Sequence, residues 1–217
     1  MRETEDEGRS WRLMGIYAKN REEWAFTSLA TQRQNGTVVA FYDTLGPSGV
    51  EYIIRQTRLE TISCAIESLR SLIMLKSQGR AESIKNFICF DRFESEIAAE
   101  AQAVGVNLFY FGDVIEAGRE IISECSFQEP TPDSVALFCY TSGTTSDPKA
   151  GKLTHGNLIS VVAGARVQGF DIDHTDCMIS YLPLAHSFEQ VLFTASLTYG
   201  TKIGYFSGDV TKLTDDC

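Results

Sequence analysis

The sequence lacks an apolar run of the roughly 20 residues that a membrane-spanning helix needs. It also lacks an excess of basic side chains, because 19 Lys and Arg stand against 29 Asp and Glu, a formal charge of −10. Nucleic-acid binding needs cations to neutralise phosphates, so this balance argues against a nucleic-acid partner. The charged segment 1–12 has no apolar centre and does not have the pattern of a secretory signal.

Closely spaced cysteine pairs are missing as well. The six cysteines are scattered and none forms a CxxC pair, so no zinc site is predicted. We expect reduced cysteines that mainly pack in apolar surroundings. They are Cys64, Cys89, Cys125, Cys139, Cys177 and Cys217.

The remaining composition is that of a globular chain, with 43% hydrophobic and 22% charged residues. Short apolar runs alternate with amphipathic stretches, which predicts an α/β fold with parallel sheets flanked by helices. Strands are predicted at 13–18, 37–42, 61–65, 87–90, 106–110, 135–140, 178–182 and 201–206. Helices are predicted at 21–34, from Pro47, at 69–76, 94–103 and 113–123, and from His155.

The segment 128–133 (QEPTPD) contains two prolines, two acidic residues and nothing apolar. Such a composition is typical of a connection rather than a helix or strand. We therefore expect a subdomain break here.

A hydroxyl-rich loop follows the predicted strand 135–140 and precedes the helix that starts at His155. Hydroxyls, backbone N–H groups near a glycine and a lysine form a concavity that suits a polyphosphate. The candidate binding residues are Thr141, Ser142, Gly143, Thr144, Thr145, Ser146 and Lys149. An ordinary surface loop rich in Ser and Thr has the same composition and is the alternative.

Two common nucleotide motifs fail to account for this loop. The nearest Walker frame, from Ser146 to Leu153, lacks the first glycine and the hydroxyl that binds magnesium. No GxGxxG pattern occurs, so a Rossmann dinucleotide site has no support.

Residues 140–157 (YTSGTTSDPKAGKLTHGN) resemble the phosphate loop of the adenylate-forming superfamily, whose form is roughly YTSGTTGxPKG followed by LTHxN. Ser146 and Ala150 stand where many members have glycine. Four more segments resemble the long-chain acyl-CoA synthetase branch. They are 14–24 (MGIYAKNREEW), 42–46 (YDTLG), 181–186 (YLPLAH) and 203–209 (IGYFSGD).

This resemblance implies that residues 1–217 are part of the large N-terminal domain of an AMP-forming ligase. Such enzymes join a long-chain fatty acid to CoA through an acyl-adenylate, with ATP and Mg²⁺ as the implied cofactor set. Association with the surface of the endoplasmic reticulum or another cytosol-facing membrane is a further implication. No protein ligand for the metal is assigned within this sequence.

His186 is the candidate catalytic residue, because the resemblance places the YLPLAH segment near the acyl carboxyl and the CoA channel. The alternative is a histidine that caps the following helix. His155 and Asn157 are expected to serve mainly in capping the helix after the phosphate loop. His174 is expected in a solvated acidic turn.

Motifs that the family carries further along are not found up to Cys217, and residues 199–203 (YGTKI) match the Thr-Glu motif only at their start. We interpret the chain as an N-terminal fragment without the C-terminal domain, and expect it to be inactive alone. Two other hypotheses are a non-catalytic remnant with weak or no nucleotide binding, and an enzyme that adenylates another carboxylic acid.

Overall fold

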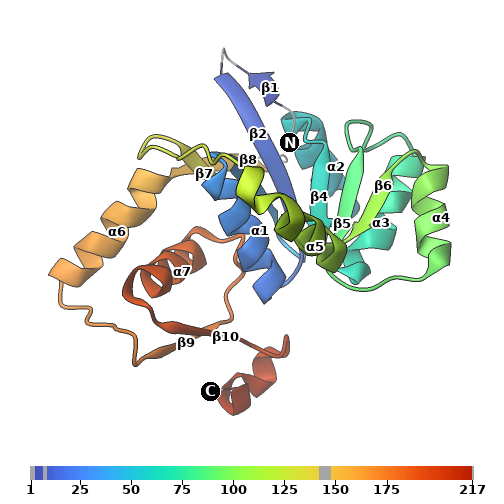
Figure 1. Ribbon diagram of the computed structural model, residues 1–217. Helices are drawn as coiled ribbons and strands as arrows, with labels where there is room; N and C mark the ends of the chain where they lie inside the picture. Colours follow the sequence, from blue (N-terminus) through green and yellow to red (C-terminus); the bar gives the residue numbers. More distant parts are fainter. Residues whose placement is uncertain (1–2, 7–8, 142–147, 217) are drawn as a thin grey trace.

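The structure is a computed structural model that describes residues 3–6, 9–141 and 148–216. Its described part contains an eight-stranded main sheet in the order β6-β5-β4-β2-β3-β7-β8, with β1 paired to β2 (Figure 1). The strands are β1 (Glu3–Asp6), β2 (Arg9–Tyr17), β3 (Thr37–Phe41), β4 (Thr61–Cys64), β5 (Asn86–Cys89), β6 (Asn107–Tyr110), β7 (Val135–Thr141) and β8 (Lys149–Thr154).

The six strands from β2 to β7 pair in parallel, whereas β1 and β8 are antiparallel to their neighbours. The predicted α/β class with a parallel sheet is confirmed. The β-branched and aromatic run of β3 explains its central place, because all five of its residues are buried. Two strands were not predicted from the sequence. One is β1, and the other is β8, which occupies the last six residues before the helix that starts at His155.

Helices cover both faces of the sheet. One core joins α2, α3 and α4 to strand residues such as Val39, Ile62 and Phe87. The other joins α1 and α7 to Ile16, Val38 and other strand residues. The helices are α1 (Glu22–Arg33), α2 (Pro47–Thr57), α3 (Ile66–Ser77), α4 (Ser95–Ala103), α5 (Phe111–Ile121), α6 (His155–Val167), α7 (Ser187–Tyr199) and α8 (Leu213–Asp216), with 3₁₀ turns η1 (Ile122–Glu124) and η2 (Val210–Lys212).

A second, two-stranded sheet follows α6 and pairs β9 (Cys177–Ser180) with β10 (Lys202–Tyr205) in parallel. The helix α7 connects these two strands and packs against α6 (Figure 1). Gly200 ends α7 with a left-handed backbone at φ 74°, a conformation in which glycine carries no steric penalty.

The order of the strands defines a point where the direction of the connections reverses. From β2 the chain moves to β3 on one side, then crosses to β4 on the other side and continues to β5 and β6. In open α/β sheets, ligands bind beyond the carboxyl ends of the strands at such a point. Here it lies between β2 and β4.

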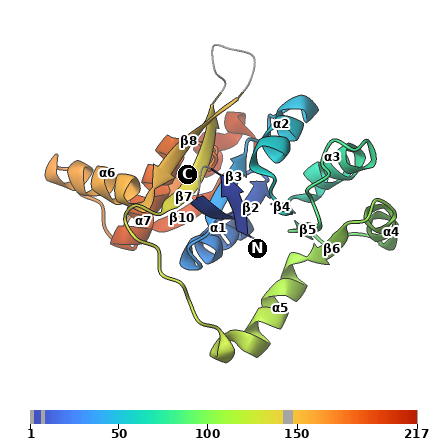
Figure 2. The ribbon, with the colours of Figure 1, turned by 90° about the horizontal axis from the view of Figure 1, so that it is seen from above.

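Residues 125–134 form a connection without helix or strand (Figure 2). The helix α5 before it has no buried residue. Beyond this connection, β7 pairs with β3 in the same sheet. The predicted subdomain break at 128–133 stays a prediction, and β7 after it belongs to the same sheet as the strands before it.

The cysteines agree in part with the sequence-based expectation. Cys64, Cys89 and Cys139 are free and buried, whereas Cys125 and Cys177 are free and exposed. Cys217 lies outside the described residues.

Candidate functional site

The β7–β8 hairpin holds the two ends of the hydroxyl-rich loop. Thr141 is the last residue of β7 and pairs directly with Lys149, the first residue of β8. Residues opposite each other in an antiparallel pair lie about 5 Å apart at their Cα atoms, so the two ends of the loop lie close together. Ser142, Gly143, Thr144, Thr145 and Ser146 lie outside the described residues, and their roles stay a prediction.

The sequence predicted a polar loop between the strand that ends near Tyr140 and the helix that begins near His155, without a strand in between. This is wrong for residues 149–154. Lys149–Thr154 forms β8, although its sequence, KAGKLT, has low β-propensity and no clear alternation. Pairing with the buried strand β7 outweighs this weak local preference. The helix does begin at His155 as predicted.

The segment that carries His186 lies beside the end of β7. The Cys139 thiol donates a hydrogen bond to the Ala185 carbonyl over 2.9 Å. Cys139 is two residues before Thr141, so both side chains are on the same face of the sheet, about 7 Å apart along the strand. The segment before His186 therefore contacts the strand from which the hydroxyl-rich loop starts.

His186 occupies the N-terminus of α7. Its Nδ1 accepts a hydrogen bond from the Phe188 backbone N–H over 3.1 Å, and the ring is exposed. The structure thus shows the capping contact that was the alternative to a chemical role. In the neutral ring, an accepting Nδ1 leaves the proton on Nε2, which can donate to a ligand oxygen.

The start of α6 is capped by Thr154 rather than by His155. The Thr154 hydroxyl accepts from the Asn157 N–H, and the Asn157 side chain accepts from the Thr154 N–H, both over 3.1 Å. Asn157 therefore has the expected structural role. His155 is the first helical residue, and partial burial lowers the pKa of its imidazole.

Two hollows are lined by residues within or next to strands of the main sheet. One, of about 430 Å³, lies at the carboxyl ends of β2, β3 and β4 and is lined by Lys19, Asp43 and Ser68 among others. It coincides with the reversal point of the sheet. The second, of about 410 Å³, is lined by Tyr140, Lys149 and other residues of α2, β2, β7 and β8. Lys149 thus stands between the hydroxyl-rich loop and a partly aromatic hollow.

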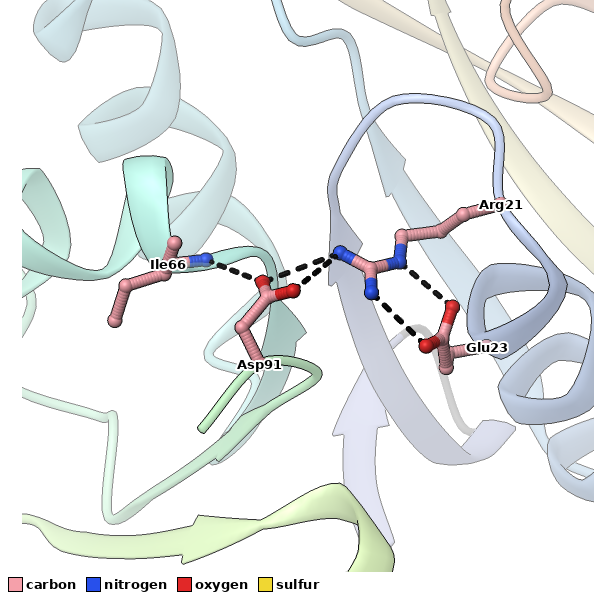
Figure 3. A network of polar contacts seen from close by, with 4 residues as sticks. All are labelled: Arg21, Glu23, Ile66 and Asp91. Atoms are coloured by element: carbon pink, nitrogen blue, oxygen red, sulfur yellow. Dashed lines mark hydrogen bonds and ion pairs between the residues drawn. The ribbon is translucent and has the colours of Figure 1, made fainter. Parts of the chain in front are cut away.

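An ion-pair network holds the loop after β2 (Figure 3). The Arg21 guanidinium donates to both Glu23 oxygens over 2.7 and 2.9 Å, and to Asp91 over 2.9 and 3.1 Å. Asp91 also accepts the backbone N–H of Ile66 at the start of α3. The Glu23 partner raises the pKa of Arg21, and the guanidinium lowers the pKa of Glu23. The network joins the carboxyl ends of β2 and β5.

Sequence inspection assigned no role to Asn20 or Ser180, which meet in this region. The Asn20 side chain donates to the Ser180 hydroxyl over 2.8 Å, although 160 positions separate the two residues. Their polar types next to buried strands are the only local signal. Neither spacing nor periodicity predicts that such distant residues pair.

Metal ligands were not expected within the sequence. Within residues 3–6, 9–141 and 148–216, no group of three or more His, Cys, Asp or Glu side chains is arranged to hold a metal ion.

His174 is exposed, and beside it Asp173 accepts hydrogen bonds from the backbone and hydroxyl of Thr175. In the same described ranges, no helix has the length and apolar character required to span a bilayer.

Comparison with known proteins identifies the family. The model of the AMP-binding enzyme family matches residues 10–217. A chain with this match, a parallel sheet and a hydroxyl-rich hairpin loop belongs to the AMP-binding enzymes.

The curated relatives carry a narrower set of names. Fatty acyl-CoA synthetase B of Dictyostelium discoideum is 35% identical over 202 residues, covering 92% of this chain and 29% of that protein. Long-chain-fatty-acid–CoA ligase 6 of Homo sapiens is 34% identical over 209 residues, covering 94% and 30%. Peroxisomal long chain acyl-CoA synthetase 7 of Arabidopsis thaliana is 34% identical over 203 residues, covering 94% and 28%. The resemblance to long-chain acyl-CoA synthetases is confirmed, and the chain spans less than a third of these relatives.

Solved structures agree on the fold. The adenylation domain of a carboxylate reductase from Mycobacterium chelonae superposes with a TM-score of 0.79 at 17% identity, covering 95% of this chain and 33% of that one. The N-terminal domain of FACL13 from Mycobacterium tuberculosis gives a TM-score of 0.72 at 16% identity, covering 95% and 47%. The chain therefore shares its fold with part of each of these two domains.

Proposed function

We propose that this chain forms the phosphate-binding part of a ligase that activates long-chain fatty acids with ATP and transfers them to CoA. One observation carries the proposal above the others. The β7–β8 hairpin brings Thr141 and Lys149 together at the base of the hydroxyl-rich loop, and Cys139 ties that hairpin to the segment before His186. The names of the curated relatives support the long-chain fatty acid as the substrate class.

The proposed reaction has two half-reactions. The fatty acid carboxylate attacks the α-phosphate of ATP and releases pyrophosphate, and the CoA thiol then displaces AMP from the acyl-adenylate. Carboxylate and triphosphate are both anionic, so the first step needs positive charge and N–H or O–H donors to offset their repulsion. We assign this task to Lys149 and to the hydroxyls of Ser142, Thr144 and Thr145, with Thr141 and Ser146 at the loop ends and Gly143 allowing close approach.

His186 is proposed to donate Nε2–H to an oxygen of the acyl carboxylate or of the adenylate. Its Nδ1 is already occupied by the Phe188 N–H, which orients the ring at the N-terminus of a 13-residue helix. A helix N-terminus also favours an anion through its backbone dipoles. Protonation at Nδ1 would break the capping contact, so the neutral ring is the form suited to this role.

Magnesium is proposed to arrive with the nucleotide. Mg²⁺ commonly keeps several waters and binds through substrate phosphates and one or two carboxylates. The described residues offer no cluster of three or more His, Cys, Asp or Glu ligands, so no residue is assigned to the metal and no step is routed through it.

Membrane association is proposed from the chemistry of the substrate. Burial of each CH₂ group contributes about 0.8 kcal/mol, so a long-chain fatty acid partitions into bilayers. We propose peripheral contact with a cytosol-facing membrane such as the endoplasmic reticulum. Co-sedimentation with vesicles of neutral phospholipid tests this contact, and a chain that stays entirely in the supernatant contradicts it.

ATP binding by the chain tests the phosphate-site assignment. Lys149→Ala should weaken ATP binding by about 1–3 kcal/mol, or roughly 5- to 150-fold in Kd, because a charged hydrogen bond to phosphate is lost. Calorimetric titration measures the change. The matched control is Lys152→Ala, an exposed lysine on the same strand. Equal ATP affinity in wild type and Lys149→Ala would show that Lys149 does not touch the nucleotide.

Turnover of the 217-residue chain tests the view that it is one part of the catalytic unit. We expect no palmitoyl-CoA from the purified chain with ATP, magnesium, palmitate and CoA. The family motifs for magnesium, ribose and the catalytic lysine are not found in its sequence. Loss of a preorganised charge-stabilising group typically costs 10²- to 10³-fold. Clear thioester formation would require those groups to be replaced by residues within this chain.

A further inference from the structure

A buried polar network joins the loop after β2 to the segment that carries His186. Asn20 has only 9% of its surface exposed. Its Nδ2 donates to the Ser180 hydroxyl over 2.8 Å and to the Leu182 carbonyl over 2.6 Å. Its Oδ1 accepts from the Leu184 N–H over 2.8 Å. One side-chain amide therefore holds both sides of Pro183.

The network continues into α7. The Ser180 hydroxyl donates to Glu189 Oε1 over 2.5 Å, and both residues are fully buried. The second oxygen, Oε2, is buried without a hydrogen-bond partner among the residues that the structure describes. Burial raises the pKa of Glu189, and the Ser180 hydrogen bond opposes this shift only in part. The Ser180 hydroxyl thus links the Asn20 amide to a buried carboxyl group.

Three further hydrogen bonds hold the backbone of the segment before His186. The Pro183 carbonyl accepts the His186 N–H over 2.8 Å, and the Leu184 carbonyl accepts from Gln190 Nε2 over 2.5 Å. The Ala185 carbonyl accepts the Cys139 thiol. Three separate elements, namely the loop after β2, strand β7 and helix α7, therefore fix the turn from which His186 projects.

We propose that Asn20 is a positioning residue for His186. Resting on the proposed function, Asn20 would set where the His186 imidazole stands relative to the acyl carboxylate without touching substrate itself. Asparagine suits the task, because one planar amide supplies two donors and an acceptor, whereas aspartate supplies no donor. The side chain of the neighbouring Arg21 is itself held by Glu23 and Asp91.

The test exploits the small number of histidines, which is three in the whole chain. Ring ¹⁵N shifts of ¹⁵N-histidine-labelled protein report the tautomer of each imidazole. In the wild type, we expect the Nε2–H form for His186, because Nδ1 accepts from Phe188. In Asn20→Asp, a carboxylate oxygen replaces the donor that faces the Leu182 carbonyl, and two acceptors repel. We expect the His186 signals to move toward the average of both tautomers, with His155 and His174 unchanged.

The control variant is Asn107→Asp, the same chemical change at an exposed residue of β6. It should leave all three histidines at their wild-type shifts. Unchanged His186 signals in folded Asn20→Asp would overturn the proposal. Movement of all three histidines would also overturn it, because that result describes a general loss of structure.

Ser180→Ala is a second variant that tests the role of Asn20 if Asn20→Asp does not fold. This variant retains the Asn20 contacts with Leu182 and Leu184 but cuts the link to Glu189. We expect a smaller shift of His186 in the same direction, and an unchanged signal would count against the proposal.

ATP titration separates this proposal from the proposed function. Asn20→Asp should bind ATP within about twofold of the wild type, because β7 and β8 rather than Asn20 hold the phosphate loop. A tenfold loss would overturn the specific role at His186. If wild type itself fails to bind ATP, the proposed function fails while the histidine signals still decide the role of Asn20.

Discussion

Asn20 and Arg21 are neighbours in sequence, yet they hold the end of β2 in different ways. Arg21 keeps its charge, has 29% of its side chain exposed, and pairs with Glu23 and Asp91. Asn20 is buried, and its hydrogen bonds to Ser180, Leu182 and Leu184 join neutral groups, with an indirect link to Glu189 through Ser180. Burial penalises a charge far more than a hydrogen-bonded amide, so each residue type matches its surroundings.

The two networks also reach different parts of the molecule. Arg21 joins residues of the first parallel strands, as Figure 3 shows for Asp91 and the start of α3. Asn20 joins the same loop to β9 and to the turn before α7, more than 150 positions further along the chain. The charged network therefore joins elements of the main sheet to one another, whereas the neutral network attaches residues 180–184 to that sheet. The buried network should be the more sensitive to substitution.

Ser180→Ala should give the largest loss of stability. It leaves one Asn20 N–H and Glu189 Oε1 without their partner, and each unsatisfied buried group costs about 1–3 kcal/mol. We expect the free energy of unfolding to fall by about 2–4 kcal/mol in urea titrations followed by circular dichroism. Ser77→Ala, which removes an exposed hydroxyl that donates to Met74, is the control and should stay within about 0.5 kcal/mol. Equal losses in both variants would contradict the contrast.

Arg21→Gln should have a smaller effect of about 1 kcal/mol, because Glu23 and Asp91 remain partly solvated when their partner is lost. The difference from wild type should shrink in 1 M NaCl, where the Debye length is about 3 Å. Arg119→Gln is the control, since Arg119 and Glu116 are both about 70% exposed. A loss at Arg21 that exceeds the loss at Ser180 would reverse the comparison.

The smallest expected effect is a pair of opposite pH dependences at two glutamates. Burial raises the pKa of Glu189 above its ordinary 4.5, so its contribution is present below pH 4.5 and lost as the pH rises through the raised native value. Arg21 lowers the pKa of Glu23, so its contribution is present above pH 4.5 and lost as the pH falls through the lowered native value.

Glu189→Gln should therefore gain stability relative to wild type as the pH rises, and Glu23→Gln should lose it. Unfolding free energies from pH 3.5 to 8 measure both differences. Two differences that do not vary with pH, or that vary in the same direction, would show that the surroundings of the two carboxyls do not differ as described.

Much of the fold was predictable, because apolar runs such as 37–42 and amphipathic stretches such as 94–103 carry their preferences locally. The strand β8 was not, since its lysines and glycine become a strand only through pairing with β7. For the site, the motif predicts roles for Lys149 and for the segment that ends at His186, and these roles stay predictions. The contacts of Asn20 with Ser180 and of Cys139 with Ala185 join residues that are far apart in the chain. They depend on the topology of the fold, which no local sequence pattern predicts.

The place of β7 beside β3 has a consequence for synthesis on the ribosome. The pairing residues Val39 and Phe138 are 99 positions apart in the chain. At about 5–20 residues per second, translation needs roughly 5–20 s to reach the second after the first. During that interval β3, with its apolar sequence TVVAF, keeps one unpaired edge, the kind of edge that recruits strands from other chains. A chaperone that shields nascent chains would have its greatest effect on this protein within that interval.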